Sequence, residues 1–375
     1  MNKELGVYIH VPFCVQKCRY CDFCSFEKSE QSTRKSYVDA LCNELIQVSE
    51  QARAHTVDTV FFGGGTPSLL STADIHKISQ TLHKYYSVTP DAEITLEMNP
   101  ATANREKLRA MREMGINRLS IGMQSSVEGE LSLLGRIHTY SDFLRSYEDA
   151  RACGFDNINV DVMYGIPDQS VQSCKSTVSS LIGLGVEHIS AYSLKIEEGT
   201  PFYRERDTLN LPDEDEEYEM YMSIAEMLSG AGYSHYEISN YAKDSRHCRH
   251  NLKYWRGQEY LGFGVAAYSY FNSKRYGNAR ELDEYISSRG SVSPVDLDEL
   301  DDSEREREYI MLRLRLREGI SDEDFYGEFG VGFSEKYASV LNKFLNSEYM
   351  ESSDGRYFLT DKGMYVSNSI LVELL

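Results

Sequence analysis

The sequence predicts an α/β fold, in which a partial (β/α)6 TIM-like barrel is followed by a C-terminal α+β domain of winged-helix type. Short β-rich runs alternate with amphipathic helical stretches as far as about residue 196, and later helical patterns lead into a hairpin pattern. Six βα units are too few for a closed eight-stranded barrel, so we expect an open one. We expect the barrel in residues 1–235, a connecting segment in 236–295 and the C-terminal domain in 296–375.

Each barrel element has a local signal in the sequence. The β-rich runs that define the six predicted strands are residues 7–11, 59–62, 93–97, 118–122, 157–161 and 188–192. Amphipathic patterns between them predict helices such as 105–114 and 141–153. Gly154 follows the second of these helices, where a C-cap glycine is expected. This alternation predicts parallel strands joined by helices.

The pattern changes after Pro201. An acidic patch at 213–217 predicts the start of a helix, because negative charge suits a helix N-terminus. This helix is expected to end near Leu228. A hairpin is predicted at 349–360, with its turn at Ser353-Asp354-Gly355. Winged-helix tails often bind DNA, but this one has little excess positive charge, which favours a packing or partner role.

Composition and charge exclude several classes of protein. Of the 375 residues, 41% are hydrophobic and 26% are charged, which is ordinary for a globular chain with a sizeable core. There are 39 Lys and Arg against 59 Asp and Glu, a formal net charge of −20. This balance argues against broad binding to nucleic acid or to an anionic membrane surface. No apolar run is long enough for a membrane span and no signal peptide is evident, so we expect a cytoplasmic protein.

The ends of the predicted strands carry unusual chemistry. The segments that follow or end them are the cysteine-rich loop after 7–11, Gly63-Gly64-Gly65-Thr66-Pro67, Glu97-Met98-Asn99-Pro100, Gln124-Ser125 and Asp161. Barrels of this type build their active sites from the loops at the carboxyl ends of the strands. We therefore expect these residues to converge on one site.

Four of the eight cysteines fall within eleven residues, which suits a metal site better than disulfides. Cys14, Cys18 and Cys21, here called the cluster cysteines, form a C-x3-C-x2-C pattern. Three thiolates suit three irons of a [4Fe–4S] cubane and leave one iron open for a ligand. A zinc knuckle that adds Cys24 as a fourth ligand, or a loop of incidental cysteines, are the alternatives.

The cysteine pattern after the first strand resembles the radical S-adenosylmethionine (SAM) superfamily. Further segments resemble the family of oxygen-independent coproporphyrinogen III oxidase-like proteins, namely 8–14, 21–23, 63–68, 120–125, 134–138 and 161–167. Within that family, His250-Asn251-Leu252-Lys253-Tyr254-Trp255 resembles the H-N-x-x-Y-W signature of HemW-type heme chaperones. The resemblance covers nearly the whole chain.

This resemblance implies a set of cofactors and contacts. In the family, the open iron is bound by the amino and carboxylate groups of SAM, and an electron from the cluster cleaves SAM to methionine and a 5′-deoxyadenosyl radical. The residues that the resemblance assigns to SAM or a second SAM are Tyr8, Tyr20, Gly64, Gly65, Thr66, Glu97, Gln124, Arg136 and Asp161. Tyr20 is expected along the adenine, and Glu97 near a ribose hydroxyl or the ammonium group. His10 is expected to face the cluster or to be purely structural.

Two departures from the oxidase favour a heme chaperone. The oxidase has a long extension before its cysteines, whereas the first cysteine of this sequence is residue 14. The oxidase also has a fourth cysteine where this chain has Phe23, and Cys24 lies one place further on. Heme requires an axial ligand, and His250 offers an imidazole, with Cys248 and His247 as alternatives. The leading hypothesis is therefore a protein that binds heme and delivers it to acceptor proteins, with a flavodoxin or ferredoxin as electron donor. The alternative is an enzyme that decarboxylates coproporphyrinogen III, so enzymatic activity stays an open question.

Overall fold

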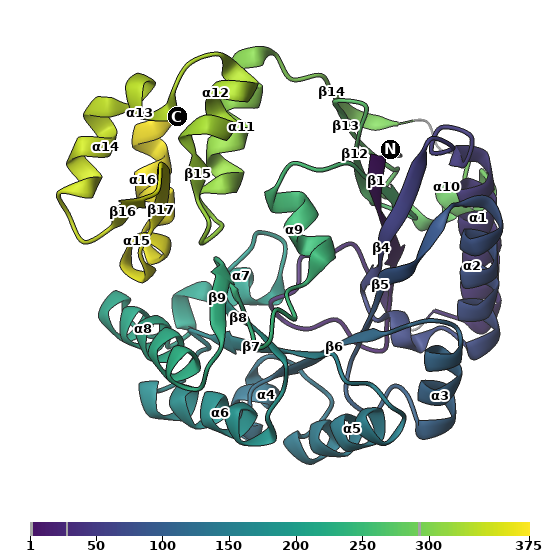
Figure 1. The fold of residues 1–375 in the computed structure, drawn as a ribbon. Coiled ribbons are helices and arrows are strands. Elements are labelled where there is room, and N and C mark those ends of the chain that lie inside the picture. The colour runs from purple at the N-terminus through teal and green to yellow at the C-terminus, as the bar shows by residue number, and fades with distance from the viewer. Residues whose placement is uncertain (1–2, 28, 292–293) are drawn as a thin grey trace. The chain divides into compact units, whose positions relative to one another are not determined.

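The structure is a computed structural model that describes residues 3–27, 29–291 and 294–375 (Figure 1). The chain forms two compact units, each assembled from segments that are distant in the sequence. The first unit comprises residues 1–169, 192–211 and 258–299, and the second comprises 170–191, 212–257 and 300–375. The domain boundaries expected after residues 235 and 295 stay a prediction.

A twisted β-sheet forms the centre of the first unit. Its strands, in spatial order, are β14 (Val295–Asp298), β13 (Lys274–Gly277), β12 (Tyr268–Phe271), β11 (Tyr260–Phe263), β1 (Lys3–Val11), β4 (His55–Gly64), β5 (Val88–Met98), β6 (Arg118–Gln124) and β7 (Ile158–Tyr164). From β11 to β7 the neighbouring strands are parallel. The carboxyl ends of these strands therefore lie along one edge of the sheet.

All six predicted strands are present, five of them as β1, β4, β5, β6 and β7, and the sixth as β8 (His188–Ser193) in the second unit. The sequence did not predict β11, which lies in the expected connecting segment. Strand β11 pairs in parallel with β1, with Gly6 opposite Tyr260. A strand of four residues has little local signal, and its partner is more than 200 residues away in the chain, so only the folded sheet identifies it.

Helices cover the sheet of the first unit. They are α1 (Gln31–Val48), α2 (Thr72–Tyr85), α3 (Arg105–Glu113), α4 (Glu128–Leu133), α5 (Tyr140–Ala152), α7 (Pro201–Glu205) and α10 (Leu282–Ser287). Helices α1, α2, α3 and α5 line one side of the strands β4, β5 and β6 (Figure 1). The predicted helices α3 and α5 are confirmed. Gly154 follows the C-cap of α5 with a φ of 86°, which favours glycine.

A buried carboxylate, Glu44 of α1, connects that helix to the segment around β11 to α10. It accepts hydrogen bonds from the Gly264 backbone N–H at 2.9 Å and the Asn278 amide at 2.7 Å, and from the Tyr285 hydroxyl. Glu44 is 2% exposed, and burial raises its pKa to about 7. These bonds satisfy a group that would otherwise be costly to bury.

The second unit begins with helices packed on a small antiparallel sheet. Its first elements are α6 (Val171–Leu184), β8, α8 (Glu214–Gly230), β9 (Ser234–Glu237), β10 (Asn240–Ala242) and α9 (Arg249–Trp255), and the strand order is β8-β10-β9. The predicted acidic opening of α8 is confirmed, because the Asp213 side chain caps the helix by accepting a hydrogen bond from the Glu216 N–H.

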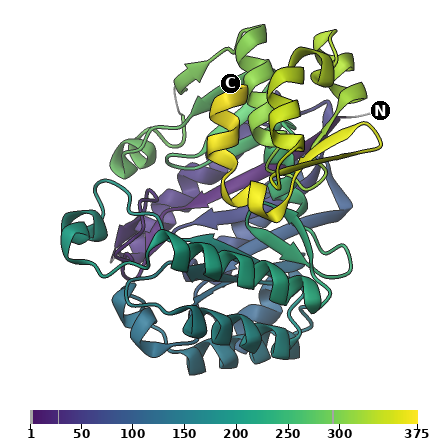
Figure 2. The ribbon, with the colours of Figure 1, turned by 90° about the vertical axis from the view of Figure 1, so that its left-hand side faces the viewer.

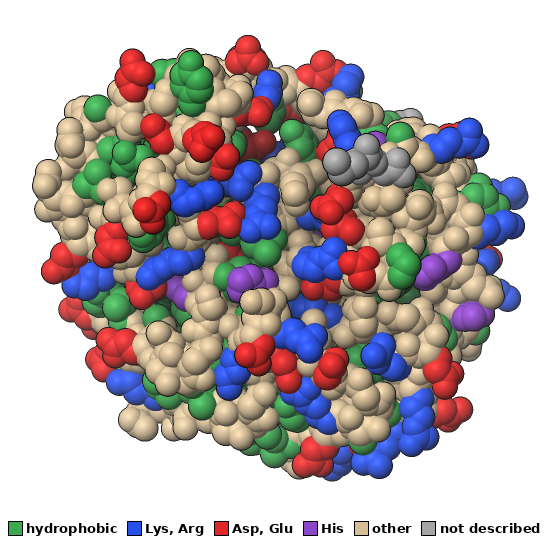
Figure 3. All heavy atoms as spheres, in the orientation of Figure 1, with side chains coloured by type: hydrophobic (Ala, Val, Ile, Leu, Met, Phe, Trp, Pro, Cys, Tyr) green, Lys and Arg blue, Asp and Glu red, His purple; other side chains and the backbone are tan. Residues whose placement is uncertain are grey.

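The C-terminal part of the second unit contains the predicted helices and hairpin. Its elements are α11 (Asp302–Arg313), β15 (Ile320–Ser321), α12 (Asp322–Phe329), α13 (Phe333–Lys336), α14 (Ala338–Leu345), β16 (Met350–Ser353), β17 (Arg356–Leu359), α15 (Asp361–Tyr365) and α16 (Ser367–Leu374). The hairpin β16–β17 is visible in yellow in Figure 2 and pairs with β15 into a three-stranded sheet. Acidic and basic side chains are interspersed over the face drawn in Figure 3. Among the described residues, no helix is both long enough and apolar enough to span a bilayer.

Candidate functional site

The cysteine loop follows strand β1 in the first unit. It is bracketed by two short parallel strands, β2 (Phe13–Cys14) and β3 (Phe26–Glu27). Arg19 anchors its middle: the Arg19 N–H donates to the Leu134 carbonyl at 3.0 Å, and the Arg19 carbonyl accepts from the Phe202 N–H at 3.1 Å. The Gln16 amide donates to the Gly135 carbonyl at 3.2 Å. These hydrogen bonds connect the backbone of the loop to the segments around Leu134 and Phe202.

The thiols of this loop are partly shielded from solvent. Cys14 is buried, whereas Cys18 and Cys21 are partly exposed. Burial raises the pKa of the Cys14 thiol, and raises that of Cys21 to about 11. When a positively charged metal centre binds such thiols, it displaces their protons, because metal ligation requires the thiolate. Among the described residues, no three His, Cys, Asp or Glu side chains are grouped so that they could hold one metal ion. A cubane uses a different iron for each cysteine, so the donor set suits it.

A chain of hydrogen bonds connects two of the cluster cysteines. The Thr66 hydroxyl donates to Cys14 Sγ at 3.7 Å, and the Asn99 amide donates to Thr66 Oγ1 at 3.0 Å. Arg136 completes the chain by donating to Asn99 Oδ1 at 2.7 Å and to Cys18 Sγ at 3.4 Å. Hydrogen bonds to sulfur are one of the means by which proteins tune an iron–sulfur cluster. The sequence placed Asn99 in a strand-end segment expected at the site, but it gave no sign of this contact between the two cysteines.

The glycine turn after β4 packs against β1 and the start of the cysteine loop. Gly64 has a φ of +110°, and a Cβ there would lie 2.5 Å from the His10 ring. A Cβ on Gly65 would lie 2.8 Å from the Phe13 carbonyl oxygen, one residue before Cys14. Contacts under 3.0 Å are not tolerated, so both positions exclude a side chain. The packing of the protein itself therefore requires glycine at both positions.

Two carboxylates, Glu97 near the end of β5 and Asp161 in the middle of β7, are close enough to interact electrostatically. Glu97 Oε2 accepts a hydrogen bond from the Gly64 N–H at 3.1 Å. Burial raises the pKa of Glu97 to about 8, and the neighbouring Asp161 adds to the effect. Asp161 itself accepts hydrogen bonds from the Asn159 amide at 2.7 Å and the Ser120 hydroxyl at 3.3 Å. A shielded pair of carboxylates favours a ligand that brings positive charge or hydroxyl donors.

Gln124 and Tyr20 complete the surroundings of the cysteine loop. Gln124 is the last residue of β6 and has a φ of 69°, which lies in the left-handed region. Residues other than glycine rarely adopt this backbone conformation, and those that do are often found at functional sites. Tyr20 packs against an apolar cluster of Leu134, Met163, Ile166 and Phe202. Burial and then the adjacent Cys18 raise its pKa, so the hydroxyl stays protonated.

Strand β1 contributes Tyr8 and His10, and both ring nitrogens of His10 are engaged. The Tyr8 hydroxyl is hydrogen-bonded to His10 Nδ1 at 3.0 Å, and His10 Nε2 to the Cys24 carbonyl at 2.9 Å. His10 therefore fixes the end of the cysteine loop. The Cys24 thiol donates to the Arg280 carbonyl at 3.6 Å. It thus has a protein partner of its own.

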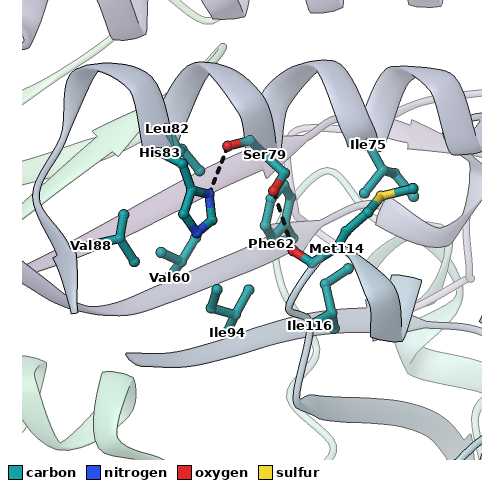
Figure 4. Close-up of a pocket in the computed structure, with 10 residues that line it drawn as sticks. All are labelled: Val60, Phe62, Ile75, Ser79, Leu82, His83, Val88, Ile94, Met114 and Ile116. Atoms are coloured by element: carbon teal, nitrogen blue, oxygen red, sulfur yellow. Dashed lines mark hydrogen bonds between the residues drawn. The ribbon is translucent and has the colours of Figure 1, made fainter. Parts of the chain in front are cut away.

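An apolar cavity of about 10 Å³ lies between α2 and the strands β4 and β5 (Figure 4). Its polar lining is satisfied internally, because the Ser79 hydroxyl donates to the Met114 carbonyl at 3.3 Å and His83 Nδ1 bonds to the Ser79 carbonyl at 2.9 Å. A volume of this size is close to the lower limit for one water molecule. The cavity is a packing defect and too small for a cofactor.

The H-N-x-x-Y-W segment lies in the second unit and forms helix α9. His250 is 1% exposed, and its Nε2 is hydrogen-bonded to the Tyr254 hydroxyl at 2.8 Å. Trp255 is partly buried against an apolar cluster of Tyr236, Ala242, Leu252 and Leu316. The imidazole expected to ligate heme iron is therefore enclosed and occupied by a neighbour. Its assignment as the ligand stays a prediction.

Comparison with known proteins places the two parts of the chain in described families. Residues 8–181 match the radical SAM superfamily, and residues 300–366 match the HemN C-terminal domain. Proteins named heme chaperone HemW from Bacillus subtilis and Escherichia coli are each 33% identical to this chain, over 97% and 98% of it and 97% of their own lengths. The relative of that name from Lactococcus lactis is 30% identical over 100% of this chain and 98% of its own.

A solved structure confirms the predicted fold class. Coproporphyrinogen III oxidase (HemN) from Escherichia coli, described as a radical SAM enzyme, matches with a TM-score of 0.84 over 99% of this chain and 89% of that one. Its sequence identity is 21%, so this likeness bears on the fold alone. The predicted partial barrel with a C-terminal domain agrees with it. By its sequence relatives, the chain belongs to the HemW family of the radical SAM superfamily.

Proposed function

We propose that the protein is a heme chaperone that holds a [4Fe–4S] cluster on the cluster cysteines, binds SAM beside it, and carries heme to acceptor proteins. The observation that carries most weight is the match to the HemW chaperones, which extends over nearly the full length of both chains. An electron donor such as a flavodoxin or a ferredoxin would reduce the cluster. Heme and its acceptor proteins are the proposed partners.

The residues around the cysteine loop fit a cluster and SAM. When bound and reduced, the cluster supplies an electron to the sulfonium of SAM. Thr66 and Arg136 donate to the sulfurs of Cys14 and Cys18, and so stabilise the thiolate form that a cluster needs. The raised pKa of Glu97 would fall beside the positive charges of the SAM ammonium and sulfonium, so Glu97 and Asp161 could then balance those charges as two carboxylates.

The backbone and apolar parts of the site suit the remaining groups of SAM. The glycine turn brings its backbone beside the cysteine loop, which leaves peptide groups as partners for the methionine end of SAM. Tyr20, on its apolar support, offers a flat face for the adenine. Gln124 is the last residue of β6, and Tyr8 lies in the second half of β1, three residues before that strand ends. These positions support the SAM contacts that the resemblance implies.

The position of Cys24 favours the chaperone over the coproporphyrinogen III oxidase. Phe23 stands where the oxidase has its fourth cysteine, and its side chain is 61% exposed. The Cys24 thiol donates to the Arg280 carbonyl. Cys24 therefore does not take the place of the fourth cysteine of the oxidase.

The proposal is tested by a paired assay on anaerobically reconstituted protein. Heme is titrated into one sample, and coproporphyrinogen III with SAM and a reductant is supplied to the other. We expect a Soret band that saturates with heme and no protoporphyrinogen in the second sample. Sustained decarboxylation would instead make the protein an oxidase, and a lack of saturable heme binding would refute the chaperone. A change in the electron paramagnetic resonance (EPR) spectrum of the reduced cluster on adding SAM tests the SAM site separately.

A further inference from the structure

Three of the histidines in the second unit have ring nitrogens that are already engaged. His188 is 0% exposed, with Nε2 bonded to the Tyr236 hydroxyl at 2.8 Å. His235 pairs through Nδ1 with Asp361 at 3.0 Å, and its Nε2 lies 3.4 Å from the Ile238 carbonyl oxygen. His250 is enclosed and bonded to Tyr254, as described above. An iron atom could reach the Nε2 atom of any of these imidazoles only by displacing a protein partner.

His247 differs from the other three. It precedes α9 by two residues and is only half-buried. Within the residues that the structure describes, neither of its ring nitrogens has a hydrogen-bond partner. One face of its ring stacks on Tyr236, with 4.1 Å between ring centroids and 20° between planes. The imidazole is thus held in one orientation while its nitrogens stay available, which suits a metal ligand.

The support beneath His247 is rigid. The Tyr236 hydroxyl accepts a hydrogen bond from the Cys248 N–H at 3.1 Å, in addition to its bond with His188. Tyr236 is 6% exposed and belongs to the apolar cluster against which Trp255 packs. The available imidazole therefore rests on a buried tyrosine, and Trp255 is the partly exposed aromatic side chain of the same cluster. An aromatic face of this kind can pack against a flat macrocycle.

The charged groups facing His247 are Arg256 and Glu318. Arg256 donates to the two carboxylate oxygens of Glu318 at 3.0 and 2.9 Å. Arg313 lies 3.6 Å from the same carboxylate, and Arg356 donates to the Glu318 carbonyl at 3.3 Å. Arg356 also lies 3.6 Å from Asp324, so three guanidinium groups face two carboxylates here. The one positive charge that is left favours a carboxylate group of a ligand, such as a propionate of heme.

We propose that His247, rather than the signature residue His250, is the imidazole that ligates heme iron, and that His250 is a positioning residue that orders α9 through Tyr254. This inference rests on the proposed heme binding and names its ligand. His250 then acts on heme through the placement of Tyr254 and Trp255. His250 Nε2 itself stays hydrogen-bonded to the Tyr254 hydroxyl and does not bind iron.

The test is a heme titration of the full-length protein with three variants. His247→Ala and His250→Ala are compared with His76→Ala, which removes an exposed histidine of α2 in the first unit. Soret position, dissociation constant and the EPR spectrum of ferric heme are recorded, with circular dichroism as a check of folding. We expect His76→Ala to match the wild type and His247→Ala to bind at least about tenfold more weakly with a shifted Soret band. Free imidazole should restore the wild-type Soret position in His247→Ala.

The outcomes separate this inference from the proposed function. His250→Ala should keep the wild-type Soret position and EPR spectrum on whatever heme it binds. A wild-type spectrum and affinity in His247→Ala would overturn the inference and leave heme binding intact. A Soret shift in His250→Ala that imidazole reverses would also overturn it, in favour of His250. If the wild type itself binds no heme, the proposed function fails, and the ligand assignment fails with it.

Discussion

Replacing Gly65 by Ala tests how tightly the glycine turn is packed against the cysteine loop. The added Cβ would lie 2.8, 2.9 and 3.0 Å from the O, N and C atoms of Phe13. The shortest of these is roughly 0.6 Å below the 3.4 Å at which ordinary contacts begin. The obstructing atoms are backbone, so no side chain can rotate to relieve the overlap. We expect a loss of about 1–3 kcal/mol in the free energy of unfolding, the usual cost of overpacking.

The assay is urea unfolding of the protein before cluster reconstitution, followed by iron and sulfide analysis after it. Since Phe13 adjoins Cys14, displacement of its backbone should also lower the iron content of Gly65→Ala. Gly183→Ala is the matched control, because a Cβ at that position in α6 meets nothing within 4 Å. It should be neutral or slightly more stable, by up to about 1 kcal/mol, as alanine is the better helix former. A Gly65→Ala protein that unfolds at the wild-type urea concentration with full iron content would refute the reasoning.

Three further predictions concern the cluster and a buried carboxylate. Replacing any one of the cluster cysteines by Ala should prevent assembly of a cluster with about four irons, whereas Cys24→Ala should retain it; iron analysis decides, and equal loss in Cys24→Ala would make that thiol a ligand. Arg136→Lys keeps the positive charge but cannot donate to both Cys18 and Asn99 as the planar guanidinium does. A potentiometric titration should therefore give a more negative reduction potential for the cluster, and an unchanged potential would contradict this. The pKa of Glu44 is raised to about 7 in the folded protein, so the folded state holds this proton more tightly than the unfolded chain, and stability should fall as the pH rises from about 4 to 7. Gln at position 44 cannot ionise, so the free energy of unfolding of Glu44→Gln, measured in urea, should rise relative to that of the wild type by roughly 3 kcal/mol across that range. Parallel pH profiles of the two proteins would exclude the effect.

The sequence determined much of the fold, because the barrel strands and their helices have strong local signals. The six predicted strands formed, as did the hairpin at 349–360 and the acidic start of α8. The cluster cysteines could be predicted as iron ligands from the sequence, because their spacing within one loop is itself the chemical pattern. The residues at the strand ends could be expected to meet, since parallel strands place their carboxyl ends on the same edge.

Only the tertiary structure decided which of these residues contact one another, and which side chains are available to a ligand. Asn99 connects Thr66 to Arg136, a contact between three loops that no local pattern encodes. Strand β11 required its partner β1 before it could be recognised. The signature residue His250 proved to be enclosed, while the ring nitrogens of His247, outside the signature, have no hydrogen-bond partner in the described part of the chain. The physical reason is that burial and hydrogen-bond partnership depend on segments far apart in the chain, whereas strand, helix and metal-loop patterns depend on neighbours.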